Sequence, residues 1–197
     1  MATDKLRINK EISGRVRCLE SPSDDISTWF PITEWKSNTV LYEWGAIAGR
    51  LFNGAGTNYS IGGMYLEYEN VTSPSTDATI PTFDRTRSIS YFNNLASPND
   101  YLRVPLTSTQ LLSSGTDYPN GNQCVFFARS QGTSGVHAVP FSNASNSKII
   151  GASLVAFVDD TDATQDLVLS SMYFSLAEQQ LKTTTSQIGV EWELTLT

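Results

Sequence analysis

The sequence predicts a mostly-β protein, either an antiparallel β-sandwich or a jelly roll, in which one amphipathic α-helix covers the sheet. Apolar and polar residues alternate over 188–196, as in a half-buried strand. Short strand-like segments separated by turn sequences recur along the chain, and only 39–52 carries a helical apolar stripe. At 197 residues we expect a single domain, 1–197, with a basic amino-terminal arm at about 1–14.

The first expected elements are a strand over 15–20 and the helix over 39–52. The helix is predicted because its apolar residues recur at spacings of three and four, while Glu43 and Arg50 fall on other faces. The residues of the apolar face are Val40, Leu41, Trp44, Ile47, Ala48, Leu51 and Phe52.

The strands expected after the helix differ in their period. The run 149–158 is continuously apolar, which is typical of a central strand covered on both faces, and Gly151 inside it favours a bulge. Strands are also expected over 61–69, 123–128, 167–174 and 188–196, and shorter ones over 30–34, 88–93 and 102–106. Two polar stretches, 71–87 and 131–147, are too long for hairpin loops and are expected to contact partners.

Charge and metal-ligand content exclude several classes of function. Lys and Arg number 13 against 20 Asp and Glu, and a net charge of −7 opposes binding to a phosphate backbone. Cys18 and Cys124 are expected to be small buried residues, with a bridge between them as the less favoured alternative. With His137 as the sole histidine, no zinc site or other cofactor is expected. The amino-terminal residues contain charges throughout, so neither a signal peptide nor a membrane anchor is expected.

Candidate catalytic groups are weak. Glu191 and Glu193 share one face of a strand, as do Glu67 and Glu69, at about 6.6 Å, a spacing that inverting glycosidases use. Glutamates that alternate with an apolar face are more typical of a solvent-facing strand. His137 lies near Ser134 without a G-x-S-x-G elbow, and Gly54-Ala55-Gly56 follows the helix where a phosphate cradle must precede one. We therefore expect no enzymatic activity.

An acidic cluster separates two of the expected strands and is the one candidate metal site. It lacks the glycine and the terminal glutamate of a calcium-binding helix-loop-helix, so it is either a loose surface calcium site or a polar hairpin loop. Its members are Asp159, Asp160, Asp162 and Asp166.

Exposed aromatic residues point to an interface. Trp29 and Trp35 flank Pro31 in a polar segment. We expect them to form one of three things: a subunit contact, part of the core, or a sugar-stacking platform. Trp44 and Trp192 are expected in the core. The expected interface combines the tryptophans, the arginines of the basic region and positions in the long loops: Trp29, Trp35, Arg15, Arg17, Thr76, Thr79, Ser142 and Asn146.

Four segments together resemble the small virion structural proteins of tailed bacteriophages: NTVLYEWGAIAGRLF, YSIGGMYLEYENV, GASLVAFVDDTDATQDLVLSSMYFS and IGVEWELTLT. The resemblance implies a non-enzymatic component of the tail, neck, fibre or capsid surface, assembled in the host cytoplasm and present in the virion. Its partners would be copies of itself and other virion proteins, with no nucleic acid and no membrane. The alternative is a carbohydrate-binding β-sandwich that uses Trp29, Trp35, Tyr101 and Tyr118 on a receptor glycan, and an acidic glycosidase comes third.

Overall fold

The computed structural model describes ten stretches of the chain. These are 12–21, 28–52, 59–70, 85–95, 99–112, 123–130, 147–158, 162–175, 177–182 and 187–196.

The elements in these stretches are mostly strands. Before the first long helix lie β1 (Ile12–Ser21), β2 (Phe30–Pro31), β3 (Lys36–Ser37) and β4 (Thr39–Val40). There follow α1 (Glu43–Phe52), β5 (Ser60–Asn70), α2 (Ile89–Asn93), β6 (Asn99–Leu112) and β7 (Gln123–Arg129). The chain continues with β8 (Ser147–Phe157), the 3-10 turn η3 (Ala163–Gln165), β9 (Leu167–Tyr173), β10 (Gln180–Lys182) and β11 (Gln187–Leu196).

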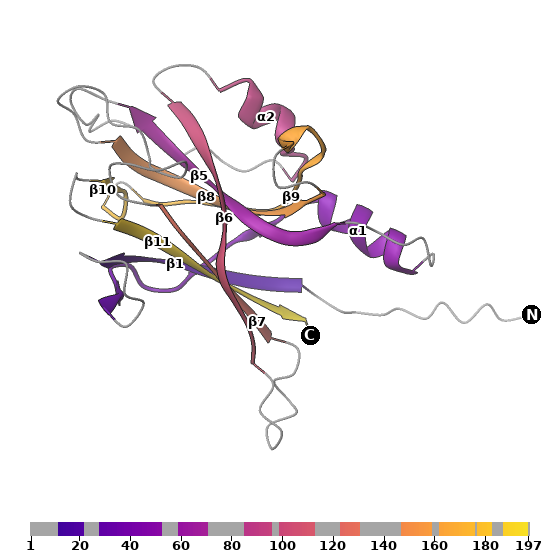
Figure 1. The fold of residues 1–197 in the computed structure, drawn as a ribbon, viewed down its shortest axis with the longest axis horizontal. Helices are drawn as coiled ribbons and strands as arrows, with labels where there is room; N and C mark the ends of the chain where they lie inside the picture. The colour runs from indigo at the N-terminus through magenta and orange to yellow at the C-terminus, as the bar shows by residue number, and fades with distance from the viewer. Residues whose placement is uncertain are drawn as a thin grey trace, which may run out of the picture.

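The strands form one curled sheet in the order β2-β1-β11-β7-β6-β5-β8-β9-β4, with β10 beside β8 and β3 beside β1 (Figure 1). All of these strand pairs among the described residues are antiparallel. The predicted mostly-β antiparallel fold is therefore confirmed, whereas the strand order does not assign it to a sandwich or a jelly roll.

Strand β6 is the corner of the sheet. Its first half pairs with β5 as far as Pro105, and from Leu106 onward it pairs with β7, with a register shift between Leu106 and Ser108. Because β6 belongs to both halves of the curled sheet, the two halves enclose a common core. This core includes Val16 and Trp192 from one half and Met64 and Leu154 from the other. The predicted burial of Trp192 in the core is confirmed.

The residues 36–40 bring the two ends of the curled sheet together. Strand β3 pairs with β1 at one end, and β4 pairs with β9 at the other. Between them, the Asn38 N–H donates to the Gly14 carbonyl at 3.2 Å, and Asn38 Nδ2 donates to Ser170 Oγ on β9 at 2.6 Å. We call this junction the seam.

The predicted strand over 88–93 is wrong, because this segment is the short helix α2. Its Ile, Tyr and Phe residues have high β propensity, but Ile89 and Phe92 are three residues apart and both pack into a second buried cluster. That cluster, which also contains Tyr65, covers the face of β5 opposite the main core. Figure 1 shows α2 beside the η3 turn.

The predicted helix is confirmed, but it begins at Glu43 and not at residue 39. Thr39 and Val40 instead pair with β9. The Glu43 carboxylate does not project freely, because it accepts a hydrogen bond from the Val168 N–H. Burial raises the pKa of Glu43, and the Val168 hydrogen bond opposes that rise. Trp44 is half-buried and packs against the main core.

Most of the other strand predictions are confirmed. The bulge expected near Gly151 is present, because Glu67 pairs with Gly151 whereas Tyr68 pairs with Ile149. A Cβ atom on Gly151 would lie 2.8 Å from the Met172 carbonyl oxygen, so the close approach of β9 requires glycine. The predicted strand 30–34 shortens to β2, and 102–106 is part of the longer β6.

Cys18 is buried and Cys124 is partly buried, and both are free thiols. Burial raises the pKa of each. Within the described residues, no helix is long and apolar enough to cross a membrane.

Candidate functional site

Two arginine–glutamate pairs lie side by side on the outer face of β1 and β11. The antiparallel register places Arg15 opposite Glu193 and Arg17 opposite Glu191. The nitrogen–oxygen distances are 2.8 Å for Arg15–Glu193 and 2.6 Å for Arg17–Glu191. These residues alternate with the core residues of the same strands, so they point away from the main core.

The indole ring of Trp35 lies against both arginines. The guanidinium carbon of Arg15 is 4.5 Å from the ring centroid, and that of Arg17 is 4.4 Å away. These distances are within the range of a cation–π interaction. We call Trp35 and the two ion pairs beneath it the Trp35 stack.

The expectation that Glu191 and Glu193 face solvent is wrong. Their side chains are only 21% and 8% exposed, because each is bound to an arginine of the neighbouring strand. The alternation of β11 identified the correct face, but nothing in the spacing showed what would cover it.

Trp29 lies on the same outer face, farther along the strands. Its ring meets Phe127 edge-on at a centroid distance of 5.3 Å and an angle of 75°. It also lies close above Gly189, where a Cβ atom would stand 2.8 Å from the indole. The structure therefore brings together the four described members of the predicted interface, Trp29, Trp35, Arg15 and Arg17, on one half of the sheet. The two arginines, which the sequence grouped with the basic amino-terminal region, belong to β1 and are ion-paired.

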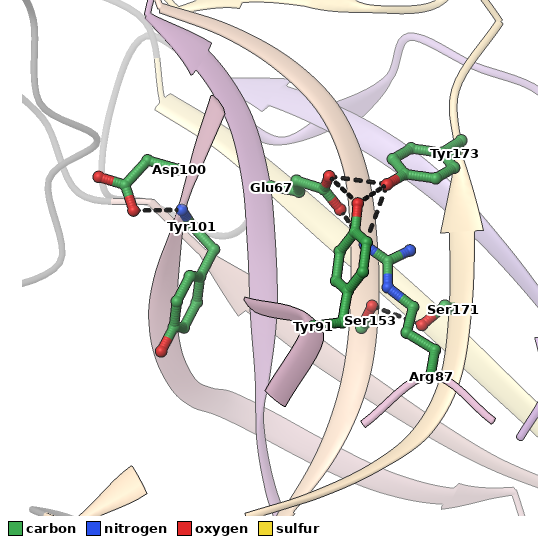
Figure 2. A network of polar contacts seen from close by, with 8 residues as sticks. All are labelled: Glu67, Arg87, Tyr91, Asp100, Tyr101, Ser153, Ser171 and Tyr173. Atoms are coloured by element: carbon green, nitrogen blue, oxygen red, sulfur yellow. Dashed lines mark hydrogen bonds and ion pairs between the residues drawn. The ribbon is translucent and has the colours of Figure 1, made fainter. Parts of the chain in front are cut away.

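A second polar cluster lies between β5, α2 and β9, and the sequence did not predict it (Figure 2). The Arg87 guanidinium forms an ion pair with Glu67, and both side chains are buried. Tyr173 donates to Glu67 at 2.7 Å and Tyr91 donates to the same oxygen at 3.0 Å, while the two phenol oxygens are 2.5 Å apart. Arg87 also donates to the Tyr173 hydroxyl at 3.0 Å and lies 3.7 Å from the Tyr91 ring centroid.

The hydrogen bonds of this second cluster join its own members to one another. Burial, together with the Glu67 charge, raises the pKa of Tyr173, and burial is also the main cause of a raised pKa at Tyr91. Both phenols therefore stay protonated at neutral pH and serve as hydrogen-bond donors, not as bases. The expected solvent-facing position of Glu67 is wrong, because α2 covers that face. Tyr65, which shares the face with Glu67, is the signal in the sequence that it would be covered.

The candidate calcium ligands do not gather among the described residues. Asp166 is buried, accepts two hydrogen bonds from Arg103 at 2.7 and 3.0 Å, and accepts a third from Tyr65 at 2.6 Å. Asp162 is exposed and caps η3 by accepting from the Thr164 N–H at 2.8 Å. In the part of the chain that the structure describes, no group of three His, Cys, Asp or Glu side chains could hold a metal ion.

Among the described aromatic residues considered for glycan binding, Tyr101 lies apart from Trp29 and Trp35. Tyr101 packs against Tyr65 and Phe92 at centroid distances of 4.8 and 5.2 Å, in the cluster under α2, and its hydroxyl donates to Asn93. Trp29 packs on β7 and β11.

Several predicted positions lie outside the described residues. These are Thr76, Thr79, Tyr118, Ser134, His137, Ser142, Asn146, Asp159, Asp160 and the Gly54–Gly56 segment.

Comparisons with models of protein families, with curated proteins and with solved structures give no match for this chain.

Proposed function

We propose that this chain is a non-enzymatic structural component of a bacteriophage particle, which acts by packing against copies of itself and against other virion proteins. The observation that carries the proposal is the Trp35 stack on the outer face of β1 and β11. Tryptophan and arginine are enriched at protein–protein contacts and among the residues whose truncation weakens binding most.

The charge balance of the stack also favours burial against a partner. Two arginines and two glutamates cancel, and each charge already has its counter-charge within the same chain. A partner that covers the stack therefore desolvates paired charges, which costs less than desolvating isolated ones. The Arg15 side chain is 49% exposed, so the edge of the stack is accessible.

The environments of the candidate catalytic carboxylates support a binding role. Glu191, Glu193 and Glu67 are each held by an arginine, and two tyrosines also donate to Glu67. A general acid or base must lie within hydrogen-bond reach of the substrate proton that it transfers. In the described residues these carboxylates are instead used to hold neighbouring elements together.

Substitution of Trp35 tests the proposal. We expect Trp35→Ala to weaken self-association by about tenfold to a hundredfold, as for a central interface tryptophan. Trp35→Phe keeps a ring over the arginines and should retain most of the association. Sedimentation velocity over a concentration series measures the effect, and melting temperatures confirm that each variant is folded.

Ala46→Ser serves as the matched control, because Ala46 is exposed on α1 away from the stack. Its association should equal that of the wild type. Unchanged association of a folded Trp35→Ala protein, or a wild type that stays monomeric at every concentration, would contradict the proposal.

A further inference from the structure

The seam contains an open cleft between the ends of two strands. Its volume is about 530 Å³, within the range of about 300 to 1,000 Å³ that is typical of binding clefts. Ile12 and Gly14 of β1 line one side, Val40 of β4 and Leu41 line the other, and Asn38 lies where the two sides meet. The cleft exists because β3 and β4 follow one another along the chain but pair with opposite ends of the sheet.

Backbone groups on both sides of the cleft point into it. In antiparallel strands the N–H and C=O of a residue point to the same side, and the side alternates along the strand. The Gly14 carbonyl accepts from Asn38, so the peptide groups of Ile12, two residues earlier, face the same way into the cleft. The Leu41 N–H donates to Leu169 on β9, so Val40, one residue earlier, directs its peptide groups away from β9 and into the cleft.

The side chains of the cleft fit an extended peptide. Ile12, Val40 and Leu41 supply apolar walls. Asn38 supplies a buried side-chain oxygen that has no hydrogen-bond partner among the described residues. Peptide groups opposite Ile12 and Val40 would extend the sheet.

We propose that residues 5–11 of a neighbouring copy occupy this cleft as an added strand, an inference that rests on the self-association proposed above. Leu6 and Ile8 alternate with Lys5, Arg7 and Asn9, which is the pattern of a strand with one apolar edge. The apolar positions would face the apolar walls of the cleft.

Two features of the sequence favour an exchange between copies. Residues 5–11 lead directly into Ile12 of β1, so this segment would have to reverse its direction to lie beside Ile12 of its own copy. Residues 5–11 carry three cations and one anion, a net charge of +2, so the remainder of the chain carries −9 against the total of −7. Opposite net charges attract the segment of one copy to the body of another over long range. At the cleft itself, Arg85 is the one charged side chain among the described lining residues, so this attraction comes from the rest of the body.

Disulfide trapping distinguishes exchange from other arrangements. Copies that carry Ile8→Cys are mixed with copies that carry Ser37→Cys, an exposed residue of the cleft, and are oxidised mildly. We expect a disulfide-linked dimer in the mixture and in neither population alone. The native Cys18 and Cys124 are present in every sample, so the two populations oxidised separately show whether these cysteines form disulfides of their own.

The outcomes separate this inference from the proposed function. An intrachain bridge in a chain with both substitutions, without dimer in the mixture, would overturn exchange. The absence of any bridge while the wild type assembles would overturn the cleft as the docking site and leave the proposed function standing. A wild type that never assembles would overturn both.

A matched pair of variants provides a second readout in the full-length protein. Leu6→Ser/Ile8→Ser removes the apolar edge and should raise the dissociation constant of self-association by about tenfold or more. Arg7→Ser/Asn9→Ser changes the opposite edge and should raise it by less than about threefold. Equal effects of the two pairs would contradict the assigned orientation.

Discussion

At the scale of single residues, the structure pairs the charges that the sequence suggested were solvated. Glu67, Glu191 and Glu193 each alternate with apolar neighbours, and the alternation correctly predicted that they leave the main core. Whether the strand face opposite the main core meets water depends on segments distant in sequence. Helix α2 covers Glu67, and the chain around Trp35 covers Glu191 and Glu193. Tyr65 beside Glu67 indicates a cover on that face, but strand periodicity does not say which segment supplies it, so the arginine partners were not predictable.

The buried pair Arg87–Glu67 should be costly to break. Arg87→Met leaves Glu67 buried without its cation, and we expect a loss of about 3–5 kcal/mol in the free energy of unfolding. Adding Glu67→Gln removes the stranded charge and should restore part of that loss. Urea denaturation of the single and double variants measures both effects, and a loss below about 1 kcal/mol for Arg87→Met would show that the pair is not a stabilising link.

At the scale of elements, short segments hold the curled sheet together. Residues 36–40 connect β1 to β9, and Lys36 of β3 also forms an ion pair with Glu178 at 2.6 Å. The sequence predicted one helix over 39–52, but its first residues became β4, because pairing with β9 outweighed the helical periodicity of Val40 and Leu41. Elements of two residues lie below what periodicity detects, so the seam could not be predicted.

The Lys36–Glu178 link should depend on pH. Burial alone would raise the pKa of Glu178, but the hydrogen bonds from Lys36 and Ser175 and the Lys36 charge lower it by more, so it lies below the ordinary value of 4.5. A carboxyl whose folded pKa is lowered stabilises the fold above its unfolded pKa and loses this contribution as pH falls through the folded value.

The advantage of wild type over Glu178→Gln in the free energy of unfolding should therefore be present at pH 7 and shrink below about pH 4.5. It should not exceed about 1 kcal/mol, because both side chains are partly exposed. Chemical denaturation across pH 3 to 7 measures the difference, with the exposed Glu34→Gln as control. A difference that is constant across this range would refute the assigned contribution.

At the scale of the whole molecule, the sequence predicted the class of fold and most of the long strands. The alternation of β11 and the apolar run of β8 depend on burial of one or both faces, which leaves a direct trace in the residue pattern. The curl of the sheet depends on the corner in β6 and on the seam, neither of which leaves such a trace. Trp29, Trp35, Arg15 and Arg17 share an outer face, and that this face is an interface stays a prediction.

Hydroxyl-radical footprinting of Trp35 in dilute and in assembled protein tests directly whether the Trp35 stack is the contact between copies. We expect the oxidation rate of Trp35 to fall on assembly, because a partner covers the stack, while the rate of the buried Trp192 stays low in both states. An assembled sample in which Trp35 is oxidised as fast as in the dilute monomer would contradict the assignment of the Trp35 stack as the contact between copies.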